Sequence, residues 1–102
     1  MSKNRDRAKP RSQEQHQADL RARGYIFRPT PDDWAPTFAD GTVAVSNVMP
    51  LSNGKFRIAV WGGDDLGMEL DLDTAQEARR QLASLPSIIT LDDLQARGFI
   101  RA

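Results

Sequence analysis

Cysteine is absent from this chain, so disulfide bonds, zinc–thiolate sites, iron–sulfur clusters and thiol catalysis are excluded. No run of residues approaches the ~20 apolar positions that span a bilayer, and the N-terminus lacks the apolar stretch of a secretory signal. His16 is the only histidine, and no carboxylate–histidine–serine set is visible. Gly62, Gly63 and Gly67 match neither phosphate-binding glycine fingerprint. We expect a soluble cytoplasmic protein with no cofactor, no membrane partner and no enzymatic activity.

Positive and negative charges are separated along the chain, although they cancel in the total. Residues 1–28 carry eight Lys and Arg against three Asp and Glu, whereas residues 29–102 carry six against eleven. Such asymmetry bears on partners rather than on fold. A flexible cationic arm can follow phosphates without reading bases, and a solubilising tail explains the same charges equally well. The candidate nucleic-acid-binding residues are Lys3, Arg5, Arg7, Lys9, Arg11, Arg21 and Arg23.

The N-terminal segment offers little to bury. Residues 1–11 contain no apolar cluster, which predicts disorder. Ser12 and Gln15 have the spacing of a capping box, and Gly24 can end the helix that they begin. The few apolar side chains of this helix leave it marginal alone. We therefore assign residues 1–24 to a basic, largely disordered or marginally helical arm and residues 25–102 to a single domain.

The strongest strand signals begin at Thr42. The segment Thr42–Val48 is rich in β-branched residues, Asn53-Gly54 predicts a tight hairpin, and Lys55–Trp61 and Met68–Leu72 both alternate apolar and polar residues. These features predict a three-stranded antiparallel meander with one apolar face. The first strand carries no inward charge that would discourage pairing, which leaves homodimerisation through a sheet edge open.

Two capped helices follow the strands. Thr74 and Glu77 begin a helix whose apolar face can cover the sheet, and Thr90 begins a shorter helix that Gly98 ends. We therefore predict an α+β domain in which a helix packs on one face of the meander, followed by a short C-terminal helix. The segment Leu20–Ile26 matches Leu94–Ile100 at five of seven positions. Either an internal repeat or two separate helix stops explains this match, and local physics favours two stops.

Acidic residues concentrate between Asp64 and Asp73, where a cation site is conceivable because hard cations take several oxygen ligands. However, Asp64 and Asp65 lie in a glycine-framed turn that favours Asp for backbone hydrogen bonds. Asp73 precedes a helix N-terminus, where negative charge is stabilised. Each acid therefore has a structural reason, and we predict no metal site.

The turn Thr30-Pro31-Asp32-Asp33 has the pattern of one capped helical turn.

The face of the sheet opposite the helix holds the best candidate for a binding surface. Arg57 and Trp61 point to the same side of their strand, and we expect Arg57 to pair across strands with Glu69 or Asp71. Because Trp and Arg are enriched at binding hot spots, Arg57, Trp61, Glu69 and Asp71 are the candidate protein-binding residues.

The block FRIAVWGGDDLGMELDL, followed by TAQEARRQLASL, resembles small proteins of tailed bacteriophages and prophages. In those proteins a strand ending in V-W-G is followed by an acidic glycine turn, a G-M-E strand and an Ala-rich helix. The resemblance covers Phe56–Leu85, about a third of the chain. It implies a phage or prophage accessory protein of unassigned activity that contacts a host or phage macromolecule in the host cytoplasm. The alternative is a nucleic-acid-associated protein that binds phosphates through its basic arm.

Overall fold

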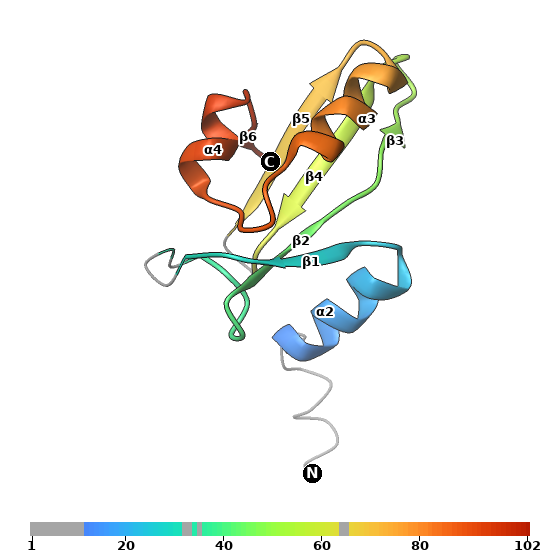
Figure 1. The fold of residues 1–102 in the computed structure, drawn as a ribbon. Coiled ribbons are helices and arrows are strands. Elements are labelled where there is room, and N and C mark those ends of the chain that lie inside the picture. The colour runs from blue at the N-terminus through green and yellow to red at the C-terminus, as the bar shows by residue number, and fades with distance from the viewer. Residues whose placement is uncertain (1–11, 32–33, 35, 64–65) are drawn as a thin grey trace.

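The structure, a computed structural model, describes residues 12–31, 34, 36–63 and 66–102. An antiparallel sheet carries the helices α3 (Ala75–Ser84) and α4 (Leu91–Ala96) on one face, whereas α2 (Gln13–Ala22) packs against the other face near β1 (Ile26–Pro29) (Figure 1). The fold is therefore α+β, as the sequence predicts. In chain order the described elements are α2 (Gln13–Ala22), β1 (Ile26–Pro29), β2 (Thr42–Val45), β3 (Met49–Pro50), β4 (Phe56–Trp61), β5 (Gly67–Leu72), α3 (Ala75–Ser84), α4 (Leu91–Ala96) and β6 (Ile100–Arg101).

The sheet is wider than the predicted meander. Its order is β1-β2-β4-β5-β6, and β3 pairs with the first part of β4. The three predicted strands are neighbours in the predicted order, but β1, β3 and β6 bring the sheet to six strands. These additions are two to four residues long, too short to show a period of two. The strand Thr42–Val45 consequently pairs on both sides and is not an edge. Dimerisation through a sheet edge stays a prediction.

The sheet face under α3 and α4 holds the larger core. In the β4–β5 ladder, Ile58 lies opposite Leu70 and Val60 lies opposite Met68, as the alternation of both segments predicts. These side chains pack with buried Ala78 of α3 and with residues of α4. The Thr74 hydroxyl accepts from the Glu77 N–H at 3.1 Å, and the Thr90 hydroxyl accepts from the Asp93 N–H at 3.1 Å. Both predicted caps are therefore confirmed.

The helices α2 and α4 end with the same geometry. Gly24 and Gly98 have φ angles of 92° and 98°, a region that side-chain-bearing residues rarely adopt. The next residue in each case, Tyr25 or Phe99, donates its N–H to the carbonyl oxygen five residues earlier at 3.0 Å. Each turn leads directly into a short strand. This shared helix stop accounts locally for the similarity between the two segments.

Helix α2 is held to the sheet largely by polar side chains. The Ala39 N–H donates to Gln13 Oε1 at 2.7 Å, and Gln17 Nε2 donates to Asp40 Oδ2 at 3.0 Å. His16 packs edge-on against Phe38 with 5.5 Å between ring centroids. These side chains and the buried Leu20 occupy positions i, i+3, i+4 and i+7, which form one helix face.

Helix α2 lies within the predicted arm of residues 1–24. The Ser12 hydroxyl accepts from the Gln15 N–H at 3.1 Å, as the predicted cap requires. The helix that follows packs on the sheet, because polar contacts replace the apolar surface that its sequence lacks. Residues 1–11 lie outside the described residues, so the disorder of the arm and the boundary at residue 24 stay predictions. The predicted turn at Asp32-Asp33 also lies outside the described residues.

A local irregularity at Ser46 separates β2 from β3. The Ser46 N–H donates to the Ala59 carbonyl oxygen at 2.9 Å, while the Ala59 N–H donates to the Ser46 hydroxyl at 2.8 Å. A side chain therefore replaces a backbone acceptor at this point of the ladder. Beyond it the chain returns to the sheet as β3, which places Met49 opposite Arg57.

Candidate binding groove

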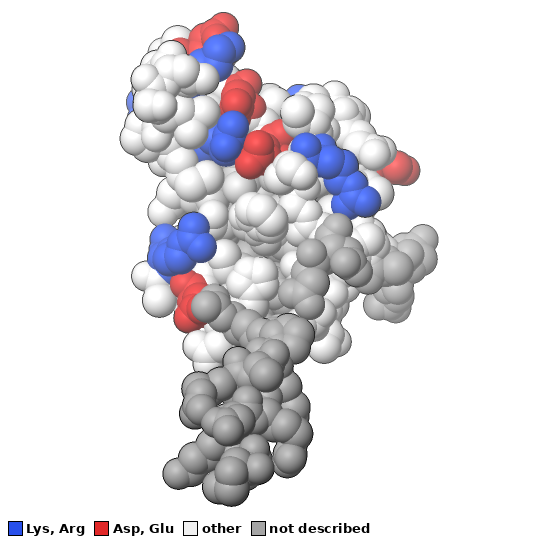
Figure 2. All heavy atoms as spheres, turned by 180° about the vertical axis from the view of Figure 1, so that it is seen from behind, with Lys and Arg blue, Asp and Glu red and all other residues white. Residues whose placement is uncertain are grey.

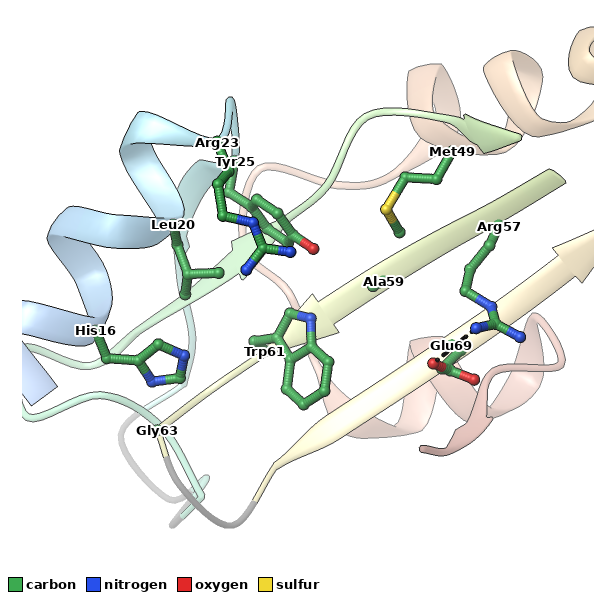
Figure 3. A pocket seen from close by; sticks show the side chains of 10 residues that line it. All are labelled: His16, Leu20, Arg23, Tyr25, Met49, Arg57, Ala59, Trp61, Gly63 and Glu69. Atoms are coloured by element: carbon green, nitrogen blue, oxygen red, sulfur yellow. Dashed lines mark ion pairs between the residues drawn. The ribbon is translucent and has the colours of Figure 1, made fainter. Parts of the chain in front are cut away.

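A groove with a volume of about 430 Å³ lies on the sheet face opposite α3 and α4 (Figure 3). Its floor is the end of β4, at Ala59 and Trp61. Helix α2 and the turn after it form one side, whereas β3 and the charged side chains of β4 and β5 form the other. The groove is lined by His16, Arg23, Tyr25, Met49, Arg57, Trp61 and Glu69, with Leu20, Ala59 and Gly63 between them.

The position of the Trp61 indole depends on a glycine across the strand pair. Trp61 lies opposite Gly67 in the β4–β5 register. A Cβ atom at Gly67 would approach Trp61 Cε3 to 2.8 Å and Cζ3 more closely still. The six-membered ring therefore occupies the space that any side chain at Gly67 would need. The half-buried indole extends across the floor between the two sides of the groove (Figure 3).

Arg57 is fixed at one end of the groove by two carboxylates. Its Nε and Nη2 donate to Asp71 at 2.7 and 3.1 Å, and Nη1 lies 3.3 Å from Glu69 Oε2. The predicted cross-strand pairing is therefore found with both acids. The hydrogen bonds from Arg57 hold the pKa of Asp71 below its usual value, and the same hydrogen bonds raise the pKa of Arg57. Two acids around one arginine leave this end with one net negative charge.

The other end of the groove is basic. The Arg23 guanidinium lies 5.4 Å from the centroid of the Tyr25 ring, and the Arg21 guanidinium lies 4.3 Å from that of Phe27. Neither arginine has an ion pair with a residue that the structure describes. Arg23 and Tyr25 extend into the groove from the end of α2, facing Trp61 (Figure 3). Cation–π contacts fix a guanidinium while leaving its donors available.

The two charged ends are separated by an uncharged surface. From behind, Figure 2 shows basic and acidic side chains gathered around an area that carries no charge. Leu20, Met49 and Trp61 supply apolar atoms to this part of the groove. The groove thus combines an apolar centre with ends of opposite charge.

The predicted protein-binding residues lie together. Arg57, Trp61 and Glu69 line the groove, and Asp71 lies beside them because it holds Arg57. Of the predicted nucleic-acid-binding residues, Arg23 lines the same groove and Arg21 lies on the exposed end of α2. Lys3, Arg5, Arg7, Lys9 and Arg11 lie outside the described residues, as do Asp64 and Asp65 of the acidic turn.

Of the seven larger residues that define the groove, three were not predicted from the sequence. His16 and Tyr25 enter the groove because α2 packs on the sheet, and Met49 enters because the chain returns at β3. The spacing of Gln13, His16, Gln17 and Leu20 indicates one helix face that could pack on the sheet. Apolar periodicity does not detect this face, because most of its residues are polar. Met49 gives no such signal, since β3 contains two residues.

Within the described ranges, no three or more His, Asp or Glu side chains are grouped so that they could hold a metal ion. The described helices include none with the length and apolar character to cross a membrane. Comparisons of the chain with protein-family models, with curated proteins and with solved structures give no match.

Proposed function

We propose that this protein is a non-enzymatic binding protein that contacts a macromolecular partner through the groove. One observation carries the proposal: Arg57, Trp61 and Glu69 line a single hollow together with Tyr25 and Met49. Aromatic residues, Arg and Met are enriched in the centres of protein interfaces. A groove that combines them with few other polar groups has the composition of a docking surface.

The geometry also lowers the entropy lost on binding. Arg57 is already held by three contacts to two carboxylates, and Trp61 is confined by the strand below it. Side chains that are ordered before association lose less conformational freedom when a partner arrives. A rigid aromatic floor next to a fixed charged pair therefore favours affinity.

The resemblance of Phe56–Leu85 to small phage and prophage proteins supplies the expected setting. In this proposal the protein is a phage or prophage accessory protein, and its partner is a host or phage macromolecule in the host cytoplasm. The resemblance supports the setting, whereas the groove supports the mode of contact.

Site-directed photo-crosslinking tests the proposal. A photoreactive residue replaces Met49 in the groove and, as a matched control, Arg79 on the exposed side of α3. Crosslinks in native-host cells from position 49 but not from position 79 are expected to identify the partner. The purified partner is then titrated with the wild type and with Trp61→Ala/Arg57→Ala, for which we expect an affinity loss of roughly 100-fold.

A second variant separates loss of binding from loss of folding. Met49→Glu introduces a charge into the groove without removing a residue of the buried core. It should retain cooperative unfolding and lose affinity for the purified partner. A partner that binds the wild type, the double variant and Met49→Glu with equal affinity would refute the groove as the docking surface.

The alternative function, phosphate binding by the basic segment, is favoured by the unpaired state of Arg21 and Arg23 among the described residues. Because α2 packs on the sheet, the appropriate truncation removes residues 1–11 and keeps Ser12. Binding to a DNA or RNA oligonucleotide is measured over a salt series for the wild type and this truncation. Affinity that falls steeply with salt and is lost on the truncation, or on Arg21→Glu/Arg23→Glu in the full chain, supports the alternative. Affinity unchanged by both changes contradicts it.

A further inference from the structure

We infer that the groove recognises an extended peptide segment with an acidic group at one end, an apolar side chain in the middle and a basic side chain at the other end. The inference rests on the proposed function and names the chemistry of its partner. The acidic group lies against Arg23, the apolar side chain lies on Trp61, and the basic side chain lies against Glu69.

The basic end is ready to accept a carboxylate. Stacking on Tyr25 and Phe27 holds the guanidinium groups of Arg23 and Arg21, and no described acid occupies their donors. A guanidinium presents a planar fork of N–H groups that matches two carboxylate oxygens. An acidic side chain or a C-terminal carboxylate can therefore form charge-assisted hydrogen bonds here without displacing an existing partner of Arg23.

The acidic end is ready to accept a cation. Arg57 contacts one oxygen of Glu69, and no residue that the structure describes donates a hydrogen bond to the other oxygen. The Glu69 side chain is 24% exposed, so this oxygen can be reached from the groove. Asp71 already accepts two hydrogen bonds from Arg57. A Lys or Arg of the partner therefore completes the charge balance at Glu69.

The centre requires an apolar group. Trp61 and Met49, both half-buried, supply the surface between the charged ends (Figure 3). An apolar side chain that covers the indole removes apolar area from water, which is favourable. Met49 is unbranched and can adjust to side chains of different shape.

The order of charges favours a peptide over a nucleic acid. A polyanion that places one phosphate on Arg23 places further negative charge toward Glu69 and Asp71, where like charges repel. A peptide can present groups of opposite sign at the two ends of the groove. Charge complementarity of this kind determines which partners bind and in which direction they lie.

Charge exchange between protein and peptide tests the inference. The full chain selects binders from a displayed random peptide library, and enriched sequences are synthesised and titrated. We expect an acidic, apolar and basic residue in one fixed order. Arg23→Glu should weaken the binding of these peptides by roughly tenfold or more, while peptides with Lys in place of the acidic residue should bind Arg23→Glu more tightly than they bind the wild type.

The matched control is Arg79→Glu, which makes the same change in charge on the exposed side of α3. It should bind the selected peptides like the wild type.

Peptides that lose binding to Met49→Glu but show no charge order and no response to Arg23→Glu would overturn this inference and leave the groove as a docking surface. Failure to enrich any peptide overturns the inference, while the crosslinking and titration at Met49 decide the proposed function. An oligonucleotide that binds the wild type and loses binding on Arg23→Glu, with no peptide enriched, assigns the groove to a polyanion.

Discussion

Trp61 and Gly67 face each other across β4 and β5, and the indole ring fills the space beside the glycine Cα. The floor of the groove therefore depends on the absence of a side chain at residue 67. A Cβ atom there would approach Trp61 Cε3 to 2.8 Å, so the ring must move when any side chain is added.

We expect Gly67→Ala to lower the free energy of unfolding by about 1–3 kcal/mol, because overpacking forces a side chain or the backbone to shift. Chemical denaturation measures the loss, and tryptophan fluorescence reports the displaced indole. In a Trp61→Ala background the same glycine substitution should cost much less, since the clashing ring is gone. An equal cost in both backgrounds would show that the ring is not the cause.

Ser46→Ala should remove the side-chain acceptor that replaces a backbone group between β2 and β3. The Ala59 N–H, which donates to the Ser46 hydroxyl at 2.8 Å, is then left without this partner in a buried position. We expect a loss of about 1–3 kcal/mol in the free energy of unfolding, measured by chemical denaturation. The exposed Ser87→Ala is the matched control and should change stability little. Similar stability of both variants would contradict the prediction.

Arg97→Ala should loosen the attachment of α4 to α3. The Arg97 guanidinium donates to Asp93 Oδ2 at 2.7 Å, to the Ser84 hydroxyl at 2.6 Å and to the Ser84 carbonyl oxygen at 2.9 Å. Loss of these hydrogen bonds, of which the one to Asp93 is partly buried, should lower the free energy of unfolding by about 1–3 kcal/mol. Arg97→Lys should restore only part of it, because an ammonium lacks the planar fork. Full rescue by lysine would indicate that charge alone matters. A loss no larger than for the exposed Arg80→Ala would show that these hydrogen bonds do not stabilise the fold.

The attachment of α2 should weaken in acid. Burial tends to raise the pKa of Asp40, but hydrogen bonds from Thr42 and Gln17 outweigh it and hold that pKa below its usual value. A carboxyl group whose pKa is lower in the folded state stabilises that state above its unfolded pKa, and this stabilisation is lost as pH falls through the folded pKa. We therefore expect the free energy of unfolding to decrease below about pH 4.

Asp40→Asn should reduce this acid-dependent loss and lower stability at neutral pH, because it removes the charged acceptor shared by Thr42 and Gln17. Unfolding curves at a series of pH values measure both effects. The exposed Asp92→Asn on α4 is the control. An acid dependence that is the same in wild type and Asp40→Asn would exclude Asp40 as its source.

Short-range patterns predicted the local structure well. Thr74 and Thr90 cap helices, Gly24 and Gly98 end them, and Gly54 adopts a φ of 86° in the predicted hairpin. Each of these outcomes depends on residues a few positions apart. The strands β4 and β5 were also predicted, because alternating side chains decide which face is buried.

The candidate site was predicted only in part, because local patterns do not connect residues that are distant in the sequence. One strand pair carries Arg57, Trp61 and Glu69, and alternation predicts that they share a face. Arg23 and Tyr25 reach the groove only because α2 packs on this sheet through Gln13 and Gln17. Those contacts join residues 23 and 26 positions apart, a distance that no local pattern spans.

The sequence by itself determined where helices begin and end, which strand faces are apolar and that Arg57 has acids on the neighbouring strand. The tertiary structure decided that a basic helix end and an acidic strand face lie on opposite sides of one aromatic floor. Capping and alternation follow from bonds and sterics within a few residues, whereas the groove requires the relative placement of α2, β3 and β5. That placement depends on contacts such as Gln17 with Asp40 and Gln13 with Ala39, which form only when distant segments pack.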